Sequence, residues 1–98
     1  MTDAADGSVG IGYSALGALT SGARNLAIGY QALDAITQAS DNIAIGYGAL
    51  TTLAHNNAAR NIAIGSYAME NINVWVTDNI AIGFEAMESA TSAADVDQ

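Results

Sequence analysis

The sequence predicts a mainly β protein, a short parallel β-roll or β-solenoid of five coils, because one motif recurs five times along it. Each copy contains a glycine, and successive glycines lie 17, 17, 19 and 18 residues apart. An apolar run ends just before each glycine, while alanine and then leucine or methionine follow three and four residues after it. The glycines are Gly12, Gly29, Gly46, Gly65 and Gly83. A repeat this short cannot bury an apolar face alone, so neighbouring copies are expected to stack.

The first half of each copy predicts a short strand. The apolar runs are Val9–Ile11, Leu26–Ile28, Ile43–Ile45, Ile62–Ile64 and Ile80–Ile82. They are mostly β-branched, they alternate large and small side chains, and each ends at glycine, as strands that lead into a turn do. In a stack of coils these strands would pair in parallel.

The second half of each copy is compatible with two structures. Tyr30, Leu33 and Ile36 lie three residues apart, and the segment 85–90 is rich in helix formers, which favours one or two helical turns. A second short strand is the alternative. The copies together predict one solenoid domain over residues 8–90, with a flexible acidic arm over residues 1–7 and an acidic tail over residues 91–98.

Alternation along the strands predicts which side chains share a face. The two large residues of each run lie on one face and the central small residue on the other. We expect the large residues to form a dry column inside the coil and the small residues to form a flat outer row. The small residues are Gly10, Ala27, Ala44, Ala63 and Ala81. This row is the predicted trimer interface, because a 98-residue solenoid has little core of its own; the alternative is that it lies under the chain's own connecting segment.

Three further columns follow from the same alignment. Five residues before the glycines stand Gly7, Arg24, Asp41, Arg60 and Asp78, which predict a ladder of alternating charge. Asparagines that can pair coil to coil stand at Asn25, Asn42, Asn61 and Asn79. Aromatic residues follow the glycines at Tyr13, Tyr30, Tyr47 and Phe84, with Ser66 in the fourth copy and Tyr67 one residue later. We expect packing along this aromatic column, with a platform for sugars as the alternative.

Composition excludes several classes of function. The formal charge of −8 repels phosphate, so no direct nucleic-acid binding is expected. The chain has no cysteine and a single histidine, His55, which leaves no thiolate site and no multi-histidine metal site. No apolar stretch is long enough to span a membrane. We therefore expect no catalytic residue, no metal, no cofactor and no membrane partner.

Two features depart from the repeat and are predicted to dock a partner. One is the insert Val74, Trp75 and Val76, which holds the only tryptophan. Tryptophan is enriched among the residues that dominate binding interfaces, although this one could instead pack over its own coil. The other is the acidic N-terminal arm with Asp3 and Asp6.

The copies Asn25–Leu33 and Asn42–Leu50, which read NLAIGYQAL and NIAIGYGAL, resemble a repeat of bacteriophage structural proteins, including tail fibres. They are also similar to the Ala-Ile-Gly repeats in the heads of trimeric autotransporter adhesins. The resemblance implies a parallel β-roll built as a homotrimer around a threefold axis. The period is longer than in those heads, and we expect no signal peptide, coiled-coil stalk or membrane anchor of the kind that such an adhesin requires. We therefore expect a virion protein rather than a cell-surface adhesin.

The expected height of the solenoid indicates which part of the virion it forms. Five coils spaced by about 4.8 Å form a knob on the order of 20–25 Å tall, too short for a fibre. The resulting hypothesis is a non-enzymatic cement or decoration trimer on the capsid surface at threefold positions, with the major capsid protein as its partner. The alternative is a receptor-binding head-fibre or tail-fibre tip that recognises host surface glycans through the tyrosine column.

Overall fold

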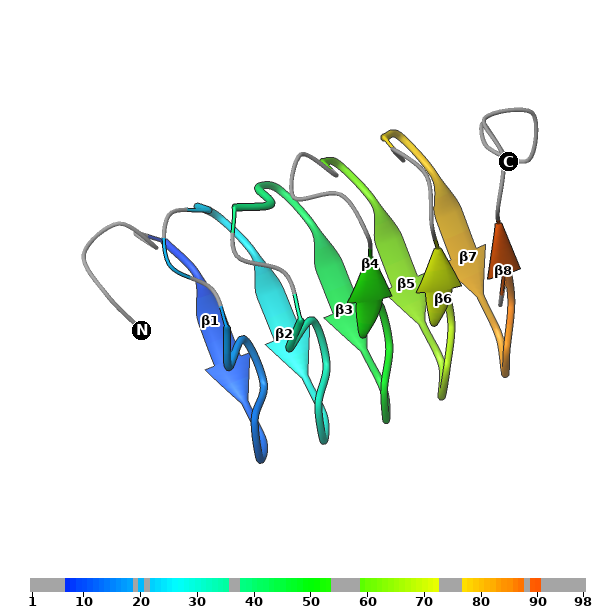
Figure 1. The fold of residues 1–98 in the computed structure, drawn as a ribbon, viewed down its shortest axis with the longest axis horizontal. Coiled ribbons are helices and arrows are strands. Elements are labelled where there is room, and N and C mark those ends of the chain that lie inside the picture. Colours follow the sequence, from blue (N-terminus) through cyan, green and yellow to red (C-terminus); the bar gives the residue numbers. More distant parts are fainter. Residues whose placement is uncertain are drawn as a thin grey trace.

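The computed structural model describes residues 7–18, 20, 22–35, 38–53, 59–72, 77–87 and 89–90. Over these residues the chain forms a parallel β-solenoid and no helix (Figure 1). The main sheet has five parallel strands in the order β1 (Val9–Ile11), β2 (Leu26–Ile28), β3 (Ile43–Ile45), β5 (Ile62–Ile64) and β7 (Ile80–Ile82). A second sheet contains β4 (Thr52–Leu53), β6 (Asn71–Ile72) and β8 (Ser89–Ala90). The predicted fold class is confirmed.

The second half of the coil is a turn that leads, in the last three copies, into a short strand. The helical alternative is therefore wrong for the described residues, and the second-strand alternative holds for β4, β6 and β8. A further set of parallel bridges joins Ser40 to Ala59 and Ala59 to Thr77 between the coils. All of these pairings join one coil to the next.

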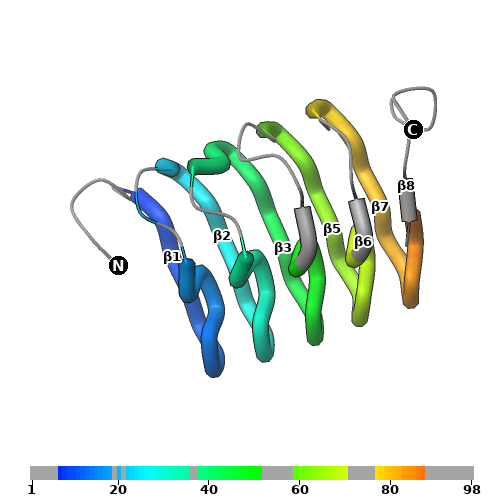
Figure 2. Tube along the Cα trace, viewed as in Figure 1, coloured from blue at the N-terminus to red at the C-terminus, as the bar shows by residue number. Residues whose placement is uncertain are grey.

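Neighbouring coils are stacked in register, so equivalent residues of the repeat stand side by side. Ala27 pairs with Ala44, and Ala44 pairs with Ala63. The Leu26 N–H donates to the Asn42 carbonyl at 2.8 Å, and equivalent bonds recur from coil to coil. Figure 2 shows that the coils follow nearly the same path. Each coil thus satisfies the backbone groups of its neighbours, as expected for a repeat that cannot fold alone.

A tight turn reverses the chain after each main-sheet strand. Gly46 has a φ of 130°, and a Cβ placed on it would lie 2.7 Å from the carbonyl group of Gly65 in the next coil. Four residues later Leu50 adopts a left-handed φ of 54°, and Leu33 and Met69 do the same in their coils. The Ala49 N–H donates to the Gly46 carbonyl at 3.3 Å and closes the turn. Only glycine allows the coils to approach so closely at the first of these positions.

The turn directs Leu50 and its equivalents into the space behind the main sheet. The buried core consists of small strand residues together with alanine and leucine or methionine residues of the turns, while Ala15, Ala86 and Met87 in the end coils are only partly buried against it. Its members include Ala27, Ala44, Ala63, Ala81, Ala32, Ala49, Ala68, Leu16, Leu33, Leu50 and Met69. The core is therefore a thin layer between the sheet and the returning chain.

The predicted assignment of the two strand faces is wrong. Ala27, Ala44 and Ala63 are fully buried inside the coil, whereas Ile80 and Ile82 are 58% and 64% exposed on the outside. Space in the thin core explains the inversion. A Cβ added to Gly10 would already lie 3.1 Å from the Ala15 carbonyl oxygen and 3.2 Å from Leu16 Cδ1, so an isoleucine would not fit there.

Candidate interaction surface

The predicted interface row is not a surface of the folded chain. Four of its five members, Ala27, Ala44, Ala63 and Ala81, are buried against the chain's own turns. The fifth, Gly10, belongs to the exposed first coil but faces Ala15 and Leu16 in the same way. The alternative that the small residues lie under the connecting segment of the same chain is therefore correct. Their side chains cannot contact another subunit.

The opposite face of the main sheet presents the large strand residues instead. We call it the outer apolar face, and its members are Val9, Ile11, Leu26, Ile28, Ile43, Ile45, Ile62, Ile64, Ile80 and Ile82. The residues of the end strands β1 and β7 are exposed, and those of the three middle strands are half-buried between their neighbours. Because the strands pair in register, these side chains form two continuous aliphatic rows. A contiguous exposed apolar patch of this kind is typical of interaction sites.

A ladder of tyrosines stands two residues beyond the ends of the strands. Tyr13 stacks on Tyr30 with ring centroids 5.4 Å apart, and Tyr30 stacks on Tyr47 at 5.0 Å, with interplanar angles of 12° and 8°. In the fourth coil, where Ser66 breaks the column, Tyr67 fills the position and meets Tyr47 edge-on at 5.2 Å. The hydrogen bond between their hydroxyls raises the pKa of Tyr67. The predicted packing of this column is confirmed for these four residues.

The stacking limits what the ladder can bind. The ring of Tyr30 has a tyrosine ring on both sides, so its faces are shared with Tyr13 and Tyr47 rather than free for a sugar. Tyr13 and Phe84, in the first and last coils, are the most exposed of the described aromatic residues, at 72% and 71%. A ligand therefore meets mainly the ring edges and hydroxyl groups along the ladder.

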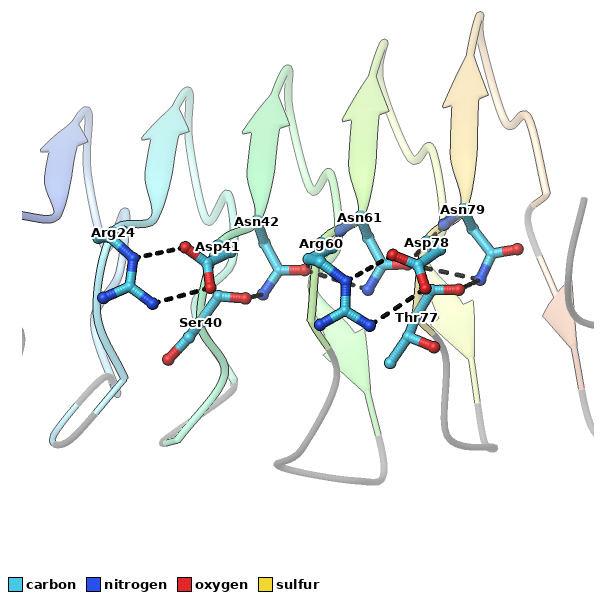
Figure 3. A network of polar contacts seen from close by, with 9 residues as sticks. All are labelled: Arg24, Ser40, Asp41, Asn42, Arg60, Asn61, Thr77, Asp78 and Asn79. Atoms are coloured by element: carbon cyan, nitrogen blue, oxygen red, sulfur yellow. Dashed lines mark hydrogen bonds and ion pairs between the residues drawn. The ribbon is translucent and has the colours of Figure 1, made fainter.

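The predicted charge ladder forms two ion pairs between coils (Figure 3). Arg24 Nε and Nη2 donate to the two carboxylate oxygens of Asp41 at 2.6 and 2.9 Å. Arg60 binds Asp78 in the same two-point geometry at 2.5 and 3.1 Å. The arginines hold the pKa of both carboxyl groups below their usual range. Since all four side chains are well exposed, the pairs act on register more than on stability.

The asparagine column is buried and continuous. The backbone N–H of Asn42 donates to Asn25 Oδ1 at 3.0 Å, and that of Asn61 donates to Asn42 Oδ1 at 3.0 Å. Asn79 continues the series at 3.2 Å, and Ser8 Oγ begins it by accepting from the Asn25 N–H at 3.1 Å. The predicted coil-to-coil amide pairing is confirmed, and its role is structural.

The predicted docking residues lie outside the described residues. They are Asp3, Asp6, Val74, Trp75 and Val76, and the single histidine, His55, lies outside them as well. Within the described residues, no group of three or more histidine, cysteine or carboxylate side chains is arranged to hold a metal ion. None of the described segments forms a helix of the length and hydropathy that a membrane span requires.

Comparisons with known proteins give no relative for this chain. No family model matches it, and searches of the curated proteins and of the solved structures find no significant match.

Proposed function

We propose that this chain is a non-enzymatic structural protein of a bacteriophage particle, which assembles as a homotrimer and binds the major capsid protein as a decoration or cement protein. The proposal rests on the phage-type repeats and on the outer apolar face. That face is the single observation that carries it, because two aliphatic rows along five strands need a partner to cover them.

Copies of the same chain are the partner that suits this face best. The rows are regular, with equivalent aliphatic side chains in successive coils, so the same rows on another copy can interdigitate with them. The formal charge of −8 disfavours close contact elsewhere between copies. Three sheets turned toward a common axis would cover all three faces at once, in agreement with the trimer that the resemblance implies. The proposed interface is thus the outer apolar face and not the row of small residues.

Light scattering after size-exclusion chromatography tests the trimer. We expect a mass three times the 9.9 kDa of the chain. Ile45→Asp should give a folded monomer, because three carboxylates would face each other in the dry interface while the core stays intact. Gln38→Asp is the matched control, since it adds the same charge at an exposed link position. A trimer that survives Ile45→Asp would contradict the proposed interface, and a wild-type monomer would remove the trimer itself.

The virion assignment needs a separate measurement. Mass spectrometry of purified phage particles should detect the chain, and electron microscopy of particles with added trimer should place density at threefold capsid positions. Density at a tail or fibre tip, together with binding on a glycan array, would favour the alternative receptor-binding function. If the chain were absent from the purified particles, both the decoration function and the receptor-binding function would be overturned.

A further inference from the structure

We infer that the tyrosine ladder is a site of oxidative cross-linking, at which Tyr30 couples to Tyr13 or Tyr47 of the neighbouring coil to form dityrosine. The three rings belong to successive coils and stack almost parallel at 5.4 and 5.0 Å between centroids. Coupling would add a covalent bond between coils that otherwise hold together without any disulfide. The inference does not depend on the proposed function.

Accessibility and geometry both favour this reaction. Tyr13, Tyr30 and Tyr47 are all exposed, so an oxidant in solution can reach them. The Gln31 N–H donates to the Tyr13 carbonyl and the Gly48 N–H donates to the Tyr30 carbonyl, both at 2.9 Å, so the backbones that carry adjacent rings are held side by side. Exposed side chains rotate on a ps–ns timescale, so two rings already in stacking contact can reorient to bond. Holding the reactants side by side raises the rate of coupling relative to free encounter.

The chemistry requires a one-electron oxidant, for which we name hydrogen peroxide acting through a haem peroxidase. Each phenol loses one electron and its hydroxyl proton and becomes a phenoxyl radical. The two radicals join through ring carbons next to the C–O bond, and the hydrogens on those carbons move to the oxygens. Two tyrosines and one hydrogen peroxide thus give one dityrosine and two waters.

The sequence provides a direct way to locate the bond. Trypsin cleaves after Arg24 and Arg60, the only basic residues it recognises here, and gives the fragments 1–24, 25–60 and 61–98. Coupling of Tyr13 to Tyr30 joins 1–24 to 25–60 with the loss of two hydrogens. Coupling of Tyr30 to Tyr47 closes a loop inside 25–60, with the same loss of mass.

The experiment treats the folded chain with the peroxidase and peroxide, digests it and measures the joined fragments by mass spectrometry and dityrosine fluorescence. We expect the joined 1–24/25–60 product at a yield several-fold above that from separated fragments that are remixed and then oxidised. Tyr30→Phe should abolish this product, whereas Tyr47→Phe is the matched control that should keep it. Circular dichroism checks that both variants remain folded.

A mixture of ¹⁵N-labelled and unlabelled chains distinguishes coupling within a chain from coupling between chains. Joined fragments that are fully labelled or fully unlabelled support the inference, and so does a higher urea midpoint of unfolding for the coupled protein. Fragments of mixed label as the main product would overturn it. Equal yields from folded chain and remixed fragments, or a joined product that persists in Tyr30→Phe, would overturn it as well.

Discussion

The side-chain oxygen of Asn42 accepts two hydrogen bonds from Asn61 in the next coil, one from the backbone N–H and one from the side-chain amide, both at 3.0 Å. Both residues are fully buried. Asn42 in turn donates its own amide to Asn25 Oδ1 at 3.2 Å and to the Ser40 carbonyl at 3.1 Å. A single buried side chain therefore links three successive coils.

Loss of this acceptor should destabilise the solenoid. Asn42→Ala removes the Oδ1 acceptor of the Asn61 N–H and side-chain amide. The cost is about 1–3 kcal/mol for each buried donor that stays unsatisfied. Asn42→Ser should cost less, because Ser8 already provides a hydroxyl acceptor to the Asn25 N–H at the equivalent position. Urea unfolding followed by circular dichroism measures both variants. If Asn42→Ser and Asn42→Ala were equally stable, the loss of the hydrogen-bond acceptor would not explain the destabilisation.

Because the core is thin, substitutions at two neighbouring strand positions should affect the free energy of unfolding differently. Ala44→Leu should destabilise the fold by about 1–3 kcal/mol, because Ala44 is fully buried beneath the turns. Ile45→Leu, on the outer apolar face, conserves volume and should change the free energy of unfolding little. Chemical denaturation of both variants provides the test. If Ala44→Leu were as stable as Ile45→Leu, the space behind the sheet would be larger than the packing indicates.

Two glycines separate backbone strain from steric conflict between coils. Gly46 and Gly83 have nearly the same φ, 130° and 131°. A Cβ on Gly46 would lie 2.7 Å from the backbone of Gly65, whereas one on Gly83 would have its nearest neighbour, Ala86 Cβ, at 4.0 Å. Gly83→Ala should therefore cost only the strain of that backbone conformation, about 1–3 kcal/mol, and Gly46→Ala should cost more. Thermal unfolding of the two variants gives the difference, and the reverse order would contradict this explanation.

The ion pairs predict a dependence of stability on pH. Arg24 lowers the pKa of Asp41 in the folded chain below its ordinary value of 3.8, so the pair stabilises the fold above that value. The contribution should disappear as the pH falls through the lower folded pKa. The melting temperature of wild type should therefore exceed that of Asp41→Asn at pH 7, and the difference should vanish in strong acid.

Asp34 provides a control of opposite sign. Burial raises its pKa, so its charged form is disfavoured in the folded chain. Asp34→Asn should raise the melting temperature at neutral pH and have no such effect once Asp34 is protonated in both states. If the melting temperatures of Asp34→Asn and Asp41→Asn changed with pH in the same way relative to wild type, the opposite pKa shifts assigned to the two carboxyl groups would be contradicted.

Trp75 remains the predicted docking residue for the capsid. Its replacement by alanine should lower capsid occupancy, with a loss of about 1–3 kcal/mol per copy if it is a dominant contact, and should leave the melting temperature nearly unchanged. Quantitative binding to capsids and differential scanning calorimetry check the two parts. A lower melting temperature with full occupancy would mean that Trp75 packs over its own coil.

Most of the architecture followed from the sequence by itself, because stacking in register is a direct consequence of repetition. The positions of β1, β2, β3, β5 and β7 coincide with the five apolar runs. The pairing of Arg24 with Asp41 and the Asn42–Asn61 contact also followed from the alignment of copies. These features depend only on which residues recur at the same place in each coil.

The tertiary structure alone decided which face of the main sheet lies inside. Alternation shows that Ile43 and Ile45 share a face and that Ala44 takes the other, but it is symmetric with respect to inside and outside. The left-handed turn at Leu50 breaks that symmetry, because it places a large side chain in the narrow space behind the sheet and leaves room only for alanine opposite. The volume available between two segments depends on the path of the returning chain, and no periodicity in the sequence encodes that path.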